Sequence, residues 1–216
     1  MEQVFSKYDA MFDDDDFHET LTVSNIGNVV GGGTPSKSKP EFYCEDGIPW
    51  VTPKDLSLDH SVFVERGNDD ISQLGLAKSS ATIMPAGTVL FTSRAPIGYT
   101  AISLGPISTN QGFKSVIPNP EIGPYFVYCF LKKNLETIEG MASGSTFKEV
   151  SGSIMKKVPV NMPNACVLKS FNKFAAPAFS TIKNNEAEIK RLTILRDSLL
   201  PKLMSGEMDL DSISID

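Results

Sequence analysis

A long helical repeat near the C-terminal end of the sequence places the strongest constraint on the fold. From about Asn164 to Met204 the only helix breakers are Pro177 and Pro201. Apolar residues recur there at alternating steps of three and four, which is the a/d spacing of helices that pack against each other. The seam consists of Leu168, Phe171, Ala175, Ala178, Ile182, Asn185, Ile189, Leu192, Arg196, Leu199 and Leu203. We predict one long helix over residues 163–205, and its seam requires a partner helix.

The seam carries two polar residues, and the helix contains an internal proline. Asn185 and Arg196 lie at seam positions, where polar side chains help to fix the register of paired helices. Pro177 predicts a kink, or a restart of the helix at its first turn. An unpaired seam would expose a long apolar stripe to water. Two copies related by a two-fold axis would bury it, so the pattern predicts a homodimer.

The segment before this helix has the character of short strands separated by turns. Runs rich in β-branched and aromatic residues end at Gly, Pro, Asn or Asp. The predicted strands lie within residues 21–30, 48–52, 62–64, 87–93, 99–103, 113–117 and 157–160. One helix over residues 124–139 interrupts them. The predicted fold class is α+β: a β-rich mixed domain over residues 20–162, followed by a long C-terminal helix of the coiled-coil type.

Charge is divided unevenly between the ends of the chain and its body. The chain has a formal net charge of −6. Residues 1–20 contribute −6 and residues 205–216 contribute −4, which leaves +4 on residues 21–204. The acidic ends therefore conceal a mildly basic body, and such a body is compatible with a nucleic-acid partner.

The two ends of the sequence predict an acidic flexible head over residues 1–19 and an acidic tail over residues 206–216. The head runs into four consecutive aspartates, and a like-charge run of this kind is usually solvated. Helical spacing nevertheless allows a short amphipathic turn at Val4, Phe5, Tyr8 and Phe12. The first twenty residues lack the apolar core of a secretory signal, and no stretch predicts a membrane span. We expect a cytoplasmic protein.

The stretch GGGTPSKS (residues 31–38) invites comparison with a phosphate-binding loop. A nucleotide P-loop needs glycine directly before its lysine and a helix directly after it. Here Ser36 precedes Lys37, and Pro40 follows too closely for a helix to begin. The glycines instead predict a tight turn at positive φ. Polar side chains in this loop could still contact a nucleic-acid backbone.

The residue combinations of the common enzymes are missing from the sequence. No G-x-S-x-G elbow is present. The two histidines, His18 and His60, have no Cys, His or Glu partner at metal-ligand spacing. The three cysteines are scattered, which predicts reduced thiols. We therefore predict no catalytic residues and no metal site.

Polar loops follow several of the predicted strands, and they contain the side chains that hold phosphates and read base edges. The candidate DNA-contacting residues are Thr34, Ser36, Lys37, Lys39, Lys54, Ser93, Arg94, Asn110, Gln111, Ser145, Thr146 and Lys148. Two alternatives stay open: Asn110-Gln111-Gly112 could simply form a turn, and Arg94 could pair with a carboxylate. Taken together, the loops favour a recognition surface over an enzyme.

Six stretches in order carry a resemblance to a known family. They are GGGTPS, IPWVTPKDL, PAGTVLFTSRAPIG, STNQGF, GSTFKEVS and LRDSLLPKLMSGE. Between about Leu21 and Met208 the chain resembles the specificity subunit of type I restriction-modification systems. The resemblance implies a target recognition domain that enters the DNA major groove, followed by a conserved spacer helix that separates two half-targets and docks methyltransferase subunits.

The same resemblance implies several partners and one departure from the family pattern. The partners would be double-stranded DNA, the modification (methyltransferase) subunits and, indirectly, the restriction subunit. S-adenosylmethionine would be expected only in the methyltransferase subunit. A full subunit holds two recognition domains and two spacer helices, whereas this sequence holds one of each. The head resembles the end of a spacer helix, which suggests a half-subunit or a split form. The alternative is an assembly or regulatory protein with a degenerate recognition domain.

Overall fold

The computed structural model describes residues 1–12, 19–94, 96–144 and 148–207 of the 216-residue chain. The chain divides into two compact units, Met1–Phe179 and Ser180–Asp216. Strands of mixed direction in the first unit and a long helix, α8 (Ala165–Met204), confirm the predicted α+β class. The division lies inside α8, well after the boundary that we predicted at residue 162, because the start of this helix packs into the first unit.

The central sheet of the first unit has five strands in the order β2-β10-β7-β8-β5. Its members are β2 (Gly27–Gly31), β10 (Lys114–Pro118), β7 (Val89–Ser93), β8 (Ile97–Ser103) and β5 (Phe63–Val64). Only β5 and β8 pair in parallel; the other neighbours are antiparallel. Every residue of β7 is buried, which explains why this strand has a continuous apolar run rather than alternation.

A second sheet has four strands in the order β3-β6-β4-β9, and its β4 and β9 run in parallel. The strands are β3 (Tyr43–Cys44), β6 (Asp69–Ile71), β4 (Ile48–Val51) and β9 (Ser108–Thr109). A separate antiparallel pair joins β1 (Glu19–Thr22) to β11 (Pro159–Met162). Between β1 and β2 the chain forms one helical turn, α2 (Val23–Ile26), inside the stretch that we had predicted as a strand.

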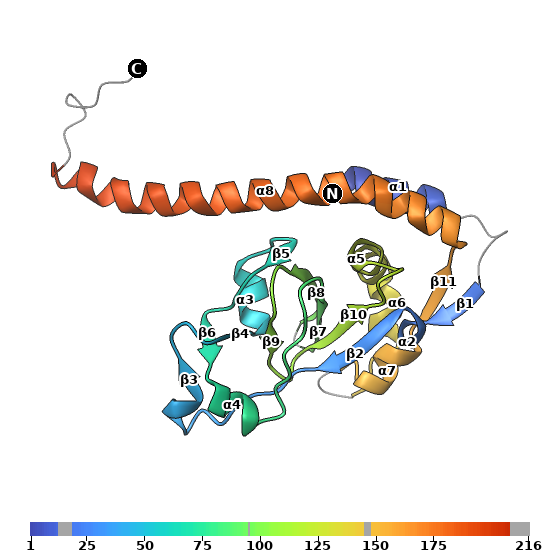
Figure 1. Cartoon of the computed structure of the whole chain (residues 1–216), viewed down its shortest axis with the longest axis horizontal. Helices are drawn as coiled ribbons and strands as arrows, with labels where there is room; N and C mark the ends of the chain where they lie inside the picture. Colours follow the sequence, from blue (N-terminus) through green and yellow to red (C-terminus); the bar gives the residue numbers. More distant parts are fainter. Residues whose placement is uncertain (13–18, 95, 145–147, 208–216) are drawn as a thin grey trace, which may run out of the picture. The chain divides into compact units, whose positions relative to one another are not determined.

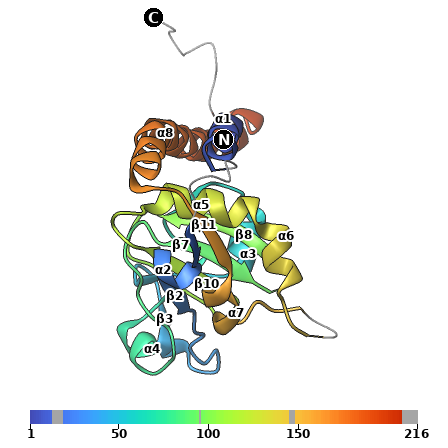
Figure 2. The ribbon, with the colours of Figure 1, turned by 90° about the vertical axis from the view of Figure 1, so that its right-hand side faces the viewer.

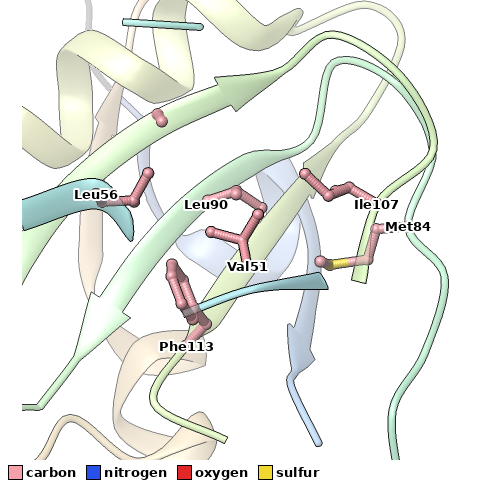
Figure 3. Packing of buried hydrophobic residues seen from close by; sticks show 7 residues of the cluster. Val51, Leu56, Met84, Leu90, Ile107 and Phe113 are labelled. Atoms are coloured by element: carbon pink, nitrogen blue, oxygen red, sulfur yellow. The ribbon is translucent and has the colours of Figure 1, made fainter. Parts of the chain in front are cut away.

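One apolar cluster joins the two larger sheets (Figure 3). Val51 comes from β4 and Leu90 from β7, while Phe113 immediately precedes β10. The other members are Leu56, Met84, Ala101 and Ile107, and each of the seven is at most 5% exposed. Because the loops at the strand ends leave directly from this rigid cluster, their backbones are held in fixed relative positions.

Short helices cover the sheets. They are α3 (Pro53–Leu58), α4 (Gln73–Ala77), the 3-10 turn η2 (Pro40–Phe42), α5 (Pro124–Lys133), α6 (Leu135–Gly140) and α7 (Gly152–Lys157). The predicted helix over 124–139 is divided in two at Asn134, whose side-chain amide donates to the Phe130 carbonyl at 2.9 Å. Figure 2 shows α5 lying across one side of the central sheet, with α1 (Glu2–Phe12) beyond it.

The prediction of a flexible head is wrong for residues 2–12, which form α1. Val4, Tyr8 and Phe12 are buried on one face of this helix. The Phe12 ring lies 5.3 Å from the ring of Phe126 on α5 and 5.2 Å from that of Phe171 on α8. Figure 1 shows α1 alongside the beginning of α8. Burial of these aromatic side chains stabilises α1 against the domain, despite the acidic residues in the segment. The four aspartates and most of the predicted tail lie outside the described residues.

Helix α8 continues through Pro177 without interruption, so the predicted restart at this residue is wrong. A proline inside a helix lacks the N–H that would otherwise bond to the carbonyl four residues earlier. Within the first unit the helix buries Leu168, Phe171, Ala175 and Phe179. This burial contributes enough apolar contact to offset one missing hydrogen bond.

Candidate nucleic-acid interface

The GGG stretch and the Asn110-Gln111-Gly112 loop, far apart in sequence, lie against each other. The Gly33 N–H donates to the Thr109 carbonyl at 2.9 Å. The indole N–H of the buried Trp50 donates to the Gly33 carbonyl at 3.0 Å. One residue later, the Thr34 hydroxyl donates to the side-chain oxygen of Gln111. Two of the predicted site residues, Thr34 and Gln111, are thus brought together by backbone contacts on either side of them.

Close approach, and not an unusual backbone conformation, explains Gly32 and Gly33. All three glycines lie in the described part of the chain, and none of them has a positive φ, so the predicted turn at positive φ is wrong. A Cβ on Gly32 would lie 1.8 Å from the Asn110 carbonyl oxygen, and one on Gly33 would lie 2.3 Å from the Ala81 nitrogen. A larger residue at Gly32 would push away the backbone of residues 109–110, and one at Gly33 would push away that of residues 80–81.

Asn110 holds the shape of its own loop. Its side-chain oxygen accepts from the Gly112 N–H at 2.8 Å, and its backbone N–H donates to the Val51 carbonyl at 3.0 Å. This is the turn alternative that the sequence left open. The loop also approaches α3 closely, because a Cβ on Gly112 would lie 2.9 Å from Pro53. The loop is therefore a rigid support that presents Gln111, which is exposed.

The end of β7 and the residue after it join the same group of loops. Both the N–H and the hydroxyl of Ser93 donate to the Gly112 carbonyl, at 2.8 and 3.1 Å, and the Val150 N–H donates to the Ser93 carbonyl at 2.9 Å. Arg94, the next residue, extends towards Glu149, with 4.0 Å between guanidinium and carboxylate. Residues 92–94, 109–114 and 148–150 thus meet at one place.

Lys114 lies at the centre of this meeting point, although the sequence analysis did not select it. It is the first residue of β10 and pairs with Gly31 of β2. Its ammonium lies 3.5 Å from the Glu149 carboxylate and 3.4 Å from the Gln111 carbonyl. The available signal was its position directly after the STNQGF stretch. The sequence places Lys114 in the following predicted strand (residues 113–117).

We name this group of loops the reading cluster: residues 31–34, 92–94, 109–114 and 148–150. It combines exposed hydrogen-bonding side chains with three cations, Arg94, Lys114 and Lys148, on a rigid backbone. Such a surface can contact phosphate oxygens and base edges. No group of His, Cys, Asp and Glu that could hold a metal ion is found among the described residues. No helix in the described ranges is long and apolar enough to span a membrane.

A pocket of about 610 Å³ on the second sheet has the opposite charge character. Four acidic residues line it together with Arg66, whose guanidinium lies 2.8 Å from Asp70 and 3.6 Å from Asp46. Burial, and secondarily Asp69, raises the pKa of Tyr43 at its edge. An acidic surface repels DNA phosphates, so the electrostatics favour the reading cluster and not this pocket as the nucleic-acid interface.

Comparison with known proteins agrees with this geometry. The family model described as the type I restriction modification DNA specificity domain matches residues 17–191. The chain belongs to this family. The matching relatives are named specificity subunits, so the prediction that the chain is not an enzyme agrees with their names.

Two curated specificity subunits illustrate the similarity. The MjaIX specificity subunit of Methanocaldococcus jannaschii is 42% identical over 144 residues, covering 66% of this chain and 33% of the relative. The HindI specificity subunit of Haemophilus influenzae is 32% identical over 193 residues, covering 88% of this chain and 41% of the relative. The chain therefore spans less than half of the length of these relatives.

Solved structures of the family share the fold. The S subunit of a type I restriction-modification system from M. genitalium superposes with a TM-score of 0.61 at 16% identity, covering 89% of this chain and 47% of that one. The HsdS subunit from Thermoanaerobacter tengcongensis gives a TM-score of 0.56, also at 16% identity, covering 96% and 51%. Identity at this level supports the fold alone.

The remaining predicted contacts of the specificity domain fall into three groups. Ser93 is fully buried, with its hydroxyl bonded to Gly112, so the prediction that it contacts DNA is wrong. The side chains that remain exposed are Ser36, Lys37, Lys39, Lys54 and Lys148. Ser36 shares a hydrogen bond with Ser38 at 2.9 Å, and the Lys39 ammonium lies 5.3 Å from the Phe42 ring centre. Ser145 and Thr146 lie outside the described residues.

The predicted seam of the spacer helix likewise contains both buried and exposed residues. Leu168 and Phe171 are buried inside the first unit, where Phe171 packs on α1, so assigning them to the helix of a second copy is wrong. Phe179 is also buried, against Phe63, Tyr125 and Tyr128, although the spacing selected Ala178 in its place. Later in the seam, Ile189 and Leu192 are 63% and 49% exposed.

Proposed function

We propose that this chain recognises DNA sequence and has no catalytic activity of its own, as one half of a type I specificity assembly. The reading cluster would contact one half of a bipartite target. The single observation that supports this proposal is the convergence of Gln111, Arg94 and Lys114 on one rigid backbone cluster. Cations beside neutral hydrogen-bonding groups are the combination that DNA-binding surfaces use.

The second part of α8 would pair with the same helix of a second copy and would dock methyltransferase subunits. From Ile182 to Leu203 the described chain leaves the seam largely uncovered, and a long apolar stripe is an interaction surface. Identical recognition domains in a two-fold assembly would read an interrupted palindrome. S-adenosylmethionine would bind only to the methyltransferase subunit.

The test uses the full chain purified together with its matching methyltransferase subunit. Methylation of a random DNA library, followed by mapping of the methylated positions, should return one interrupted motif with two inverted halves. Arg94→Ala and Lys148→Ala should weaken binding to this motif by roughly 5- to 100-fold, the range for loss of one base or phosphate contact. Lys132→Ala, an exposed lysine on α5, is the matched control and should bind normally.

Absence of methylation at any bipartite motif, with the complex intact, would overturn the proposal. That outcome would favour a second function, which the exposed face of α8 supports independently: an assembly or regulatory protein that dimerises or sequesters the methyltransferase subunit. The two functions make different predictions for Arg94→Ala. Only DNA recognition predicts that this variant assembles normally while losing its DNA preference.

A further inference from the structure

The carboxylate of Glu149 faces two of the cations of the reading cluster, Arg94 and Lys114. Its Oε2 is 4.0 Å from Nη1 of Arg94, and its Oε1 is 3.5 Å from Nζ of Lys114. These three residues come from three separate segments of the chain. A single anion therefore faces two of the cations that we assign to DNA contact.

Lys114 is built into this position and does not move freely in solvent. Its side chain is only 16% exposed. The aliphatic stem passes between two glycines, since a Cβ on Gly31 or on Gly152 would lie 3.9 Å from the Lys114 Cδ. The stem is thus packed, while the ammonium reaches the edge of the cluster.

Glu149 is likewise held in place by its backbone. Its N–H donates to the Ser143 carbonyl at 2.9 Å, and its carbonyl accepts from the Ser143 N–H at 3.1 Å. The next residue, Val150, is bonded to Ser93 as described above. The Glu149 side chain is 40% exposed, so it lies at the surface where a DNA phosphate would arrive.

The two ion pairs are easy to exchange. Their distances of 3.5 and 4.0 Å are long for charge-assisted hydrogen bonds, and partly exposed pairs of this kind are weak. A phosphate oxygen can therefore replace the carboxylate as the partner of either cation. In the free chain, the Glu149 carboxylate neutralises part of the positive charge of the reading cluster.

We propose that Glu149 is a specificity-determining positioning residue, an internal substitute for a DNA phosphate that occupies Arg94 and Lys114 in the free chain. This inference rests on the proposed DNA recognition. Binding to non-specific DNA is almost entirely electrostatic, so the internal anion weakens it most. A cognate site adds base contacts that the anion does not oppose, and discrimination between sites increases.

The test compares Glu149→Gln with the unchanged chain, each in complex with the methyltransferase subunit. Fluorescence anisotropy measures affinity for a random-sequence duplex and for the duplex carrying the mapped motif, at salt concentrations between 50 and 200 mM. We expect non-specific binding to tighten by about two- to five-fold at low salt. The slope of log affinity against log salt should steepen by up to about 0.9, the contribution of one phosphate contact. Cognate affinity should change less, so the specificity ratio falls.

Three further variants isolate the cause. Glu121→Gln removes the same charge from an exposed residue beyond the opposite end of β10 and should leave the slope unchanged. Glu149→Asp keeps the charge and should restore the original slope. In a chain that also carries Arg94→Ala and Lys114→Met, Glu149→Gln should have no effect on the slope, because no cation remains to be released.

The possible failures are distinguishable. If the complex prefers a motif but Glu149→Gln leaves the non-specific affinity and the salt slope unchanged, this inference is overturned and the proposed function stands. An effect of equal size in the Arg94→Ala, Lys114→Met background would also overturn it. The cause would then be the general loss of a negative charge near DNA, and not the release of these two cations. If the unchanged complex prefers no duplex, both proposals are overturned together.

Discussion

The two parts of α8 have the same apolar periodicity and opposite environments. In residues 165–179, Phe171 and Phe179 are fully buried beneath aromatic side chains of the first unit. In residues 180–204, Ile189, Leu192 and Leu200 are each about half exposed or more. The comparison teaches that helical spacing locates an apolar face but does not tell what covers it. One part of the seam stabilises its own domain, and the other part is available for assembly.

The largest expected effect comes from a substitution in the buried part of α8. Phe171→Ala removes a ring that lies 5.7 Å from the ring of Tyr8 and 5.2 Å from that of Phe12. The loss of a buried Phe side chain costs about 3–5 kcal/mol in free energy of unfolding, as measured by urea denaturation. Phe174→Ala, three residues later but 42% exposed, is the matched control and should cost less than about 1 kcal/mol. Equal costs would contradict the stabilising role of the buried face in this part of α8.

The next test places charged residues on the exposed part of α8. Replacing Ile182, Ile189 and Leu192 with Asp should weaken self-association by at least about 100-fold, because three apolar side chains would lose their contacts. The control places Asp at Asn184, Ala187 and Ser198, which adds the same charge on the opposite side of the helix. Light scattering gives the mass of each variant. A dimer that survives the first set of substitutions would exclude pairing through this seam.

A third test uses cysteines as reporters of buried and exposed positions in the first unit. Cys129 on α5 is fully buried, whereas Cys166 near the start of α8 is exposed, as is Cys44. In the native protein a thiol reagent should label Cys44 and Cys166 rapidly and Cys129 only after unfolding. Phe171→Ala should accelerate labelling of Cys129, because it loosens the packing of α1 and α8 over α5. Unchanged protection in this variant would show that the aromatic contacts are not what shields α5.

The same cysteine gives a pH dependence. Burial, and secondarily Asp9, raises the pKa of Cys129 from its ordinary value of 9.0 to about 12. Above pH 9 the thiol ionises in the unfolded chain but not in the folded one, so the unfolded state is favoured as the pH rises towards 12. Between pH 8 and pH 10.5 this residue should cost about 2 kcal/mol of stability. Urea denaturation of Cys129→Ala should show a drop that is smaller by this amount.

The smallest effect is expected at the edge of the buried part. Asp9 on α1 and Lys133 on α5 form an ion pair at 2.6 Å, with more than a third of each side chain exposed. Such pairs contribute at most about 1 kcal/mol, so Asp9→Asn should lower the free energy of unfolding by no more than that. A cost approaching that of Phe171→Ala would mean that charge, and not aromatic packing, holds α1 in place.

Prediction from the sequence succeeded where short-range signals dominate. The strands near residues 87–93 and 113–117 form as expected, because β-branched runs between Gly and Pro residues favour strands locally. The GGG stretch was predicted to turn at positive φ, and the reason for Gly32 was missed. That reason is the approach of the Asn110 backbone, which local sequence does not encode.

In the candidate site, too, local sequence did not predict the contacts between distant segments. The polar loops at strand ends were selected from composition, and Thr34, Arg94 and Gln111 do lie in the reading cluster. Ser93 was selected for the same reasons and is buried, because a neighbouring loop covers it. Lys114 and Glu149 were not selected, since nothing in their local sequence distinguishes them from ordinary charged residues.

The sequence by itself determined the family, the order of the strands along the chain and the helical period of its C-terminal segment. These follow from local side-chain chemistry, through turn residues, branched side chains and heptad spacing. Only the tertiary structure decided which apolar positions are covered and which charges meet. Tyr8 and Phe171, or Arg94 and Glu149, come from distant segments, and their contact depends on how sheets and helices pack. Burial is a property of those neighbours, so the same heptad pattern ends in a domain core at one end of α8 and in an open face at the other.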